Sequence, residues 1–345
     1  MERMVSGDRR THDSALFDAL AEQGPARRSF LRSAWFGAAT PAPDRFVLAD
    51  KLGAPLAGLA LTQRRKGSLT LREVAGGYWP FRGVPLARDV QVAPLAHVLG
   101  DHRERLGRIW RLGPVEAGDP SLEMLSAAAR MAGWHMLSRP LGRVFELDLA
   151  ALGAQGDWPS AKTRRKNRWR KRRLEEENGP LRVEFFTGTN WTHAQRDAMA
   201  QVEAASWLCQ LDHGGDTKFR NPAMRGYWEA LCADPQLAAM LFGSLMWLGD
   251  TPAAFTFGVH AGDVRYYIAN NYDQRFTQFG PGRVLLYDDF ARAAEQGVAR
   301  ISWGLGDAGY KSEMGALPGP EMVDLLFVRG ALLSRLLSPW WERAA

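Results

Sequence analysis

The segment from residue 240 to residue 272 contains the pattern that most constrains the fold of this chain. Three apolar stretches, residues 240–248, 252–260 and 264–272, are joined by three-residue turns that contain Gly and Asp. Turns this short connect neighbouring antiparallel strands, so the pattern predicts a three-stranded meander. In the middle stretch Phe255, Phe257 and Val259 lie on one side of the strand, which predicts that one face of the meander is buried.

A loop with two glycines follows the meander and leads into an amphipathic segment that ends near Gly297. The N-terminus of a helix carries unpaired N–H groups and partial positive charge, which favour an anion such as phosphate. Gly280 and Gly282 would let the backbone approach such a ligand, and Arg283 would add a charged contact. A tight turn between a strand and a helix also needs glycine, so the loop by itself leaves both interpretations open. It lacks the Gly-Lys-Ser/Thr ending of a Walker loop and the third glycine of a dinucleotide fingerprint.

The length of 345 residues exceeds that of one ordinary core, so two domains are expected. Residues 151–160 are rich in Gly and small side chains, and we place the boundary there, which gives domains 1–155 and 156–345. Both halves contain a strand meander followed by a helix, although no sequence repeat is present. These patterns predict a fold of the α/β class in the broad sense, with helices and a mixed sheet (α+β).

The positive charge is concentrated in one predicted helix, residues 161–178. This helix has nine Lys or Arg and three Glu, and the difference of six equals the net charge of +6 of the whole chain. Such a run is typical of proteins that bind nucleic acid or an anionic surface. The alternative is a solvated helix that Trp169 and Leu174 dock onto the second domain, because charges on all sides argue against deep burial.

The sequence also gives expectations for the location of the protein, the state of its cysteines and metal binding. No apolar stretch reaches the ~18–20 residues of a membrane span, and the N-terminus lacks the apolar core of a signal peptide, so we expect a cytoplasmic protein. Trp340 and Trp341 in the closing segment suggest an additional peripheral contact at the inner membrane surface. Cys209 and Cys232 are not at CxxC spacing and no His/Cys cluster has zinc spacing, so we expect buried free thiols and no metal.

The order of meander, glycine loop, helix and strand resembles the core of the GNAT acyltransferase fold. The segments VEAASWL, NNYDQRF, FGPGRVLL, GDAGYKSEMG and KTRRKNRWRKRRLEEENG make the resemblance more specific. They look like the CelD-type acyltransferases, GNAT-related proteins of bacterial cellulose, exopolysaccharide and lipid loci. In the N-terminal half GAPLAGLAL, IWRLGPVEAGDP and AGWHMLSRP resemble the first lobe of that family. The resemblance implies tandem GNAT-like (acyl-CoA N-acyltransferase) lobes, of which the N-terminal one is degenerate.

The resemblance also implies a co-substrate and a set of site residues. Acetyl-CoA or another acyl-CoA would place its pyrophosphate on the glycine loop, with no metal. Acyl transfer needs a group that takes the acceptor's proton and a group that protonates the leaving thiolate. Glu203 is the candidate base, Tyr310 is the candidate acid, and Asp273 borders the loop near the thioester. The cofactor-binding residues would be Gly280, Gly282, Arg283 and Val284, and the substrate-binding residues would be Trp207, Tyr272, Lys311 and Arg165.

Simpler interpretations of two candidates stay open at the level of sequence. Glu203 shares a helix face with Trp207, four positions later, and would also fit as a solvated helix residue. Asp273 would also fit as a helix or turn cap. Two positions depart from the family pattern, since Leu208 replaces the usual basic residue after Ser-Trp and Ser302 replaces an acidic residue. If those positions handle the acceptor, the acceptor or the activity differs from that of the family.

The favoured function is transfer of an acetyl or longer acyl group from acyl-CoA to an amine or hydroxyl of a sugar, a polysaccharide precursor or a lipid base. The partners would be acyl-CoA, a small-molecule, saccharide or lipid acceptor and an anionic membrane surface, whereas nucleic acid is not expected. A second hypothesis is a Fem-like transferase that uses aminoacyl-tRNA, because Fem-type proteins also have paired GNAT-like lobes. Their coiled-coil insertion has no counterpart here, since no sustained heptad run occurs. A third is a non-catalytic scaffold that binds nucleic acid or anionic membrane through the basic helix.

Overall fold

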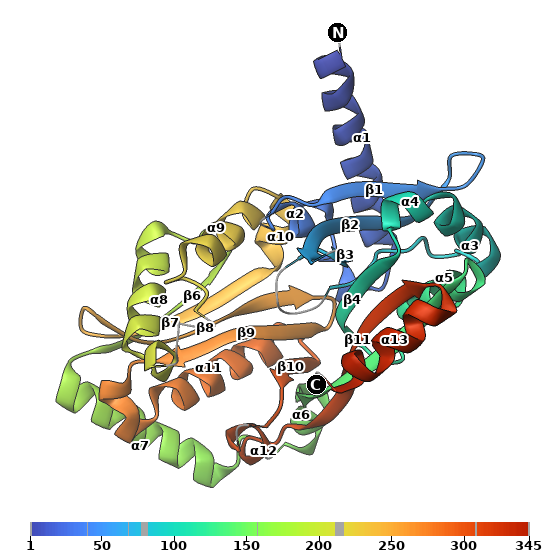
Figure 1. Cartoon of the computed structure of the whole chain (residues 1–345). Coiled ribbons are helices and arrows are strands. Elements are labelled where there is room, and N and C mark those ends of the chain that lie inside the picture. The colour runs from blue at the N-terminus through green and yellow to red at the C-terminus, as the bar shows by residue number, and fades with distance from the viewer. Residues whose placement is uncertain are drawn as a thin grey trace. The chain divides into compact units, whose positions relative to one another are not determined.

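The computed structural model describes residues 2–39, 41–67, 69–76, 82–156, 158–210, 217–307 and 309–343. The chain forms two compact units (Figure 1). Unit 1 comprises Met1–Phe145, Leu305–Ala308 and Pro318–Ala345, and unit 2 comprises Glu146–Gly304 and Gly309–Leu317. Unit 1 therefore includes the closing strand and helix of the chain. The functional division at residue 155 stays a prediction.

The sheet of unit 1 has the strand order β1–β2–β3–β4–β11–β5. The pairs β1–β2, β2–β3 and β4–β11 are antiparallel, whereas β3 and β4 pair in parallel. The strands are β1 (Asp44–Ala49), β2 (Pro55–Lys66), β3 (Leu69–Val74), β4 (Ile109–Glu116), β5 (Trp134–Asp148) and β11 (Leu317–Arg329). The helices are α1 (Glu2–Gln23), η1 (Ala26–Arg28), α2 (Ser33–Gly37), α3 (Val92–Asp101), α4 (Arg103–Leu106), α5 (Pro120–Met131) and α13 (Ala331–Arg343).

Residues 82–87 of unit 1, which we call the insert segment, fill the gap that opens where β3 ends. The parallel pairing of β3 with β4 extends no further than Glu73 and Arg111. Beyond that point the insert segment makes backbone hydrogen bonds to β4 on one side and to β2 on the other. These bonds run from Arg82 N–H to Pro114 O (3.2 Å), from Gly58 N–H to Pro85 O (3.0 Å) and from Ala87 N–H to Leu56 O (2.9 Å).

The sheet of unit 2 has the strand order β10–β9–β8–β7–β6. The antiparallel meander that the sequence predicts is confirmed, because β7 pairs with β8 and β8 with β9 in antiparallel register. The strands are β6 (Leu181–Thr187), β7 (Leu241–Leu248), β8 (Thr251–Ala261), β9 (Val264–Tyr272) and β10 (Arg300–Leu305). The helices are α6 (Leu149–Gln155), α7 (Ala161–Asn178), α8 (His193–Ala205), η2 (Trp207–Gln210), α9 (Pro222–Leu231), α10 (Pro235–Met240), η4 (Gln274–Phe279), α11 (Pro281–Glu295) and α12 (Tyr310–Glu313).

Both faces of the unit 2 sheet are buried, and not only the face that carries Phe255 and Phe257. On that face the ring of Phe257 contacts Trp228 of α9. On the opposite face Thr256 donates a hydrogen bond to Asp289 of α11. Figure 1 shows α8 and α9 on one side of these strands and α11 on the other. The sequence indicated burial of one face, and the second face is buried because α11 packs back across the strands that precede it.

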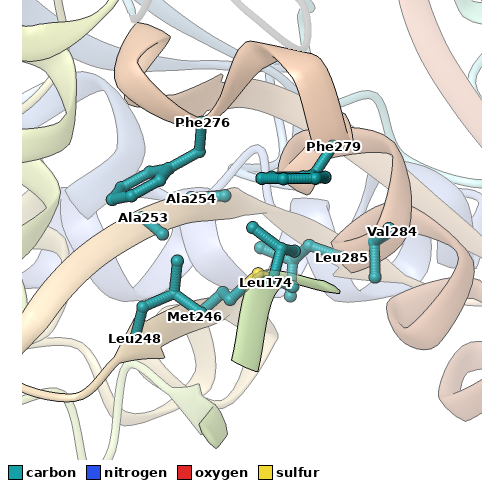
Figure 2. Close-up of a cluster of buried hydrophobic side chains, with 9 residues drawn as sticks. All are labelled: Leu174, Met246, Leu248, Ala253, Ala254, Phe276, Phe279, Val284 and Leu285. Atoms are coloured by element: carbon teal, nitrogen blue, oxygen red, sulfur yellow. The ribbon is translucent and has the colours of Figure 1, made fainter. Parts of the chain in front are cut away.

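A hydrophobic cluster joins the basic helix α7 to the segment around the glycine loop (Figure 2). Leu174 of α7 is fully buried in it, which confirms that this residue docks the helix, whereas Trp169 is 47% exposed. The rings of Phe276 and Phe279 project from η4 toward the β8 residues at the base of the cluster. The buried members are Leu174, Met246, Leu248, Ala253, Ala254, Phe276, Phe279, Val284 and Leu285.

The closing segment differs from its expected form. We expected a strand followed by an apolar tail with both tryptophans at a surface, and the tail is the helix α13. Trp341 is 3% exposed and lies under the guanidinium of Arg139, 4.0 Å from the ring centre, so it cannot contact a membrane. Trp340 is 55% exposed. The free thiols Cys209 and Cys232 are partly exposed, whereas burial was expected.

Candidate functional site

The glycine loop of unit 2 has the geometry of a helix start with a left-handed cap. Gly280 has φ +57° and ψ +55°, a conformation that side chains with a Cβ adopt at a cost. Pro281 occupies the first turn, where its missing N–H costs nothing. Gly282 is needed for another reason, because a Cβ there would lie 3.0 Å from Cδ1 of Tyr272 on β9. Gly280 therefore sets the backbone of the loop, and Gly282 lets α11 approach the strand.

Two arginines from different helices converge on this loop. The guanidinium atoms of Arg170 on α7 lie 3.7–3.9 Å from the position that a Cβ on Gly280 would occupy. Arg283 is in the first turn of α11, and its Nη2 pairs with Glu313 at 2.7 Å. The pKa of Arg170 is lowered, first by burial and then by the positive charge of Arg283. An anion bound between these two positive charges would stabilise both of them.

The backbone of the first turn of α11 adds donors for an anion. The Val284 N–H donates to Gly280 O at 3.1 Å, and its side chain is fully buried in the cluster of Figure 2. Val284 itself therefore contributes to packing. The N–H groups of Gly282 and Arg283 precede the first intrahelical bond, so they have no acceptor within the helix. Two N–H groups and two guanidinium groups thus meet at one helix N-terminus, where the helix dipole also favours negative charge.

Strands β9 and β10 separate next to this loop. They pair in parallel only from Val264 to Tyr266, opposite Arg300 to Ser302, although β9 continues to Tyr272. A register shift between β8 and β9 leaves Ile268 as an extra residue, which is the form of a β-bulge. The later backbone groups of both strands are therefore not paired with each other. In unit 1 the equivalent gap between β3 and β4 is filled by the insert segment.

Two buried polar atoms in unit 2 stand without a hydrogen-bond partner near this opening. Oδ1 of Asn270 is one of them, and it lies 3.6 Å from the Cβ position of Gly282. The other is Oγ of Ser302, which is fully buried at the last residue pair between β9 and β10. Buried polar atoms in folded proteins nearly always have a partner, so such atoms are typical of a binding site. The sequence singled out Ser302 as a departure from the family pattern, but gave no sign of Asn270.

Glu203 is fully buried and accepts three backbone hydrogen bonds. They come from the N–H groups of Lys218 (2.7 Å), Phe219 (2.9 Å) and Arg220 (2.8 Å). Burial raises the pKa of the Glu203 carboxyl, and these bonds oppose the rise. The carboxylate therefore holds the segment 218–220 against α8. The solvated position that the sequence left open is wrong, because no part of the residue is exposed, and its role as a base stays a prediction.

Asp273 caps the short helix η4 between β9 and the glycine loop. It is 1% exposed, and its carboxylate accepts hydrogen bonds from the N–H and the Nε of Arg275, both at 2.9 Å. This is the turn cap that the sequence offered as the alternative for this residue. Whether Asp273 also takes part in chemistry stays a prediction.

Tyr310 and Lys311 begin the short helix α12, rather than ending the preceding strand as expected. The Tyr310 ring contacts Trp303 of β10 edge to face, with ring centres 5.5 Å apart. Lys311 is 6% exposed and its Nζ donates to Gly304 O at 3.2 Å. The ion pair between Glu313 and Arg283 ties α12 to the first turn of α11. The structure thus brings Tyr310 into the group of elements around the glycine loop.

The other predicted acceptor residues have mixed surroundings. Trp207 is 49% exposed, while its neighbour Leu208 is 8% exposed and part of the core. Tyr272 packs against the cluster of Figure 2 and against Gly282. Arg165 lies on the exposed side of α7. Tyr272, Arg283 and Tyr310 are linked through the glycine loop and α12, whereas Glu203 contacts a different segment.

The described part of the chain has no group of three or more His, Cys, Asp or Glu side chains suited to hold a metal ion. Among the helices that the structure describes, none is both long and apolar enough to cross a membrane.

Comparisons with known proteins address the fold. Residues 161–312 match the family described as an acetyltransferase (GNAT) domain. FemX is similar with a TM-score of 0.64 and 12% identity, over 94% of this chain and 98% of that one. L-PGS from Bacillus licheniformis gives a TM-score of 0.56 and 14% identity, over 96% and 97%. A tandem GNAT protein from the clavulanic acid biosynthesis pathway gives 0.50 and 13%, over 93% and 96%.

These likenesses confirm a mixed α/β fold of the GNAT type. At such low sequence identity, similarity to the solved structures shows the fold alone, and the CelD-type assignment stays a prediction. No curated protein matches the chain in sequence. The matched region, residues 161–312, includes the basic helix, the glycine loop and the start of α12.

Proposed function

We propose that unit 2 transfers an acetyl or longer acyl group from acyl-CoA to an amine or hydroxyl of a small molecule, a saccharide precursor or a lipid base. The observation that carries this proposal is the pair Arg170 and Arg283 at the left-handed Gly280 cap of α11. A diphosphate would neutralise both guanidinium groups and accept from the free N–H groups of the first turn. The match of residues 161–312 to a GNAT domain supports the same function.

The proposed chemistry is direct attack of the acceptor on the thioester. The pantetheine arm would lie where β9 and β10 separate, and Asn270 Oδ1 would accept one of its amide N–H groups. Tyr310 would give its hydroxyl proton to the leaving thiolate. Glu203 and Asp273 already accept backbone N–H groups, which favours a positioning role for both. The acceptor would meet Trp207, and its proton would leave to water or to a carboxylate.

Isothermal titration calorimetry with CoA and acetyl-CoA tests the cofactor assignment. Gly282→Asp places a carboxylate at the first turn of α11 and against Tyr272, so it should abolish measurable binding. Gly226→Asp on α9 is the matched control, since nothing lies within 4 Å of a Cβ there. Equal binding of CoA by wild type and Gly282→Asp would refute the assignment of the loop.

A second candidate is the Fem-like transferase of the second hypothesis above, which would draw its acyl group from aminoacyl-tRNA. The observation in its favour is the exposed side of α7, which presents Trp169 among cations. RNA held by that side would dissociate steeply with salt, because each neutralised phosphate releases counterions. Filter binding of tRNA at roughly 50 and roughly 200 mM salt tests this candidate, because the affinity of a phosphate-binding protein falls steeply over that range. No retention at low salt would remove both the tRNA hypothesis and a nucleic-acid scaffold.

An apolar stripe on α13 supports the proposed contact with an anionic membrane. Leu332, Leu336 and Trp340 are spaced by four residues and are 75%, 69% and 55% exposed. A stable protein interface uses roughly 20–30 residues per side, so a stripe of three side chains is too small for one. A bilayer boundary needs no shape-matched partner, and the exposed Arg335 beside the stripe would favour anionic lipid.

A further inference from the structure

Unit 1 contains an apolar cavity that the proposed transferase function does not use. It lies between the end of α1, the insert segment, β4 and the start of α5, and its volume is about 40 Å³. The apolar wall includes Leu20, Leu31, Val84, Leu112, Val115 and Leu125. Four residues of the insert segment line the cavity, Gly83 to Leu86, so the segment that closes the gap beyond β3 also builds part of this wall.

A wider hollow adjoins the cavity at the surface of unit 1. Its volume is about 510 Å³, and it shares Pro25, Leu86 and Ser121 with the inner cavity. The exposed Arg88 lies on this outer hollow, where water screens its charge. Because the two spaces share lining residues, the outer hollow is the entry from solvent that we infer for the inner cavity. An inner volume of ~40 Å³ corresponds to about three water molecules at ~10–15 Å³ each, which suits a chain of three to five carbons.

A buried ionic cluster lies in the polar part of the cavity wall. Arg28 Nη2 is 2.5 Å from a Glu116 oxygen and 3.3 Å from an Asp119 oxygen. The three side chains are only 9–11% exposed, and together they carry one positive and two negative charges. Asp119 also caps α5 by accepting the Ser121 N–H, so the helix N-terminus compensates part of its charge. Among the ion pairs of the described residues, Glu116 pairs with one guanidinium and shares it with Asp119, so one negative charge of the cluster is in excess.

We propose that this cavity binds a small amine that carries a short alkyl chain. The chain fills the inner apolar cavity, and the ammonium group lies against the Glu116 carboxylate. A carboxylate ligand would add a third negative charge beside the cluster, and an alcohol would leave the excess charge as it is. The inner cavity holds only a few apolar carbons, and immobilising the ligand offsets part of the hydrophobic gain, so we expect an affinity in the millimolar range.

Ligand-observed NMR titration of the full chain tests this inference with three probes of equal length: n-butylamine, n-butanol and n-butyrate. We expect n-butylamine to saturate at millimolar concentration, n-butanol to bind at least about fivefold more weakly and n-butyrate not to bind. Addition of CoA should leave n-butylamine bound, which separates this site from the proposed cofactor site in unit 2. The inference is overturned if n-butylamine does not bind, if n-butanol or n-butyrate binds as tightly, or if CoA displaces the amine.

Two variants locate the site. Glu116→Gln should remove the preference for the amine over the alcohol, whereas Glu123→Gln, an exposed residue of the same helix region, should keep it. Leu122→Trp, at a half-buried position of the cavity wall, should prevent binding of all three probes. This second variant keeps the test valid if Glu116→Gln does not fold. Unchanged amine binding in Leu122→Trp, or an unchanged preference in folded Glu116→Gln, refutes the proposal.

Discussion

The guanidinium of Arg170 on α7 lies beside Gly280 and feels the positive charge of Arg283 on α11, although 113 positions separate the two arginines in the sequence. The lowered pKa of Arg170 reflects burial first and the positive charge of Arg283 second. An arrangement of this kind stores repulsion that an anionic ligand relieves. The relationship therefore links the basic helix to the glycine loop and gives that helix a defined place in the proposed cofactor site.

The first prediction concerns these two arginines. Arg170→Gln and Arg283→Gln should each weaken CoA binding by about 10–100-fold, since a hydrogen bond to a charged group contributes about 1.5–3 kcal/mol. The double variant should lose less than the sum, because each single change also relieves repulsion. Calorimetry with CoA measures both effects. Arg168→Gln on the exposed side of α7 is the control, and an equal loss in that variant would point to general attraction by the helix.

The second prediction concerns Tyr310. Tyr310→Phe keeps the ring that packs on Trp303 and removes only the hydroxyl. We expect kcat for acyl transfer to fall by about 10²–10⁴-fold, with CoA affinity and Tm nearly unchanged, because a general acid acts in the transition state. Thiol release from acyl-CoA with a panel of amine acceptors measures kcat. Near-full turnover with a good acceptor would exclude Tyr310 as the acid.

The third prediction concerns Glu203. In Glu203→Gln the amide NH₂ faces backbone donors, so at least one of the three N–H groups loses its acceptor. We expect the free energy of unfolding to fall by about 1–3 kcal/mol, the usual cost of a buried unsatisfied group. Urea denaturation measures it, with the exposed Glu295→Gln as control. A variant of unchanged stability with greatly reduced turnover would instead support the role of a base.

The same residue makes stability depend on pH. The folded-state pKa of Glu203 is raised above its ordinary value of 4.5, so the folded chain binds the proton more tightly than the unfolded chain. Its contribution to stability is therefore present below about pH 4.5 and is lost as the pH rises through the folded-state pKa. Glu203→Gln should remove this part of the pH dependence. An identical slope of unfolding free energy against pH in both proteins would contradict the assignment.

The fourth prediction concerns the carboxylate of Asp289 on the buried face of α11. It accepts hydrogen bonds from Thr256 (3.0 Å) and Tyr267 (2.6 Å), and pairs with Arg265 at 3.2 Å. Asp289→Asn leaves the buried Arg265 charge without its counterion, which should cost about 3–5 kcal/mol. The double variant Asp289→Leu with Arg265→Met should recover most of that loss. Urea denaturation checks this, and a loss below about 1 kcal/mol in Asp289→Asn would contradict it.

The fifth prediction concerns the apolar stripe of α13. Leu336→Glu should lower the fraction of protein that sediments with vesicles of anionic phospholipid by at least about fivefold, because it places a charge in the apolar stripe. Leu52→Glu is the matched control, since Leu52 is 94% exposed in a turn away from this helix. Sedimentation that is equal for wild type and both variants would exclude the stripe as a membrane contact.

Local patterns in the sequence determined the elements around the candidate site. Short Gly-Asp turns and alternation at Phe255 and Phe257 were enough to predict the meander, because turn length and side-chain period are properties of a few adjacent residues. Gly280 and Gly282 marked the start of α11 for the same reason. Trp169 and Leu174 were the two apolar residues that one interpretation of the basic helix used to dock it, and only Leu174 is buried.

Tertiary structure alone decided which of these elements meet. The backbone N–H groups that donate to Glu203 lie 15–17 positions downstream, and Arg170 reaches Gly280 only because the cluster around Leu174 holds α7 against η4 and α11. The insert segment closes the gap between β3 and β4 in unit 1 with backbone hydrogen bonds. In the described part of unit 2 no such segment bonds into the gap between β9 and β10. No local pattern in the sequence revealed this difference. Periodicity records which face of an element is apolar, but the partner of that face depends on packing between residues far apart in the chain.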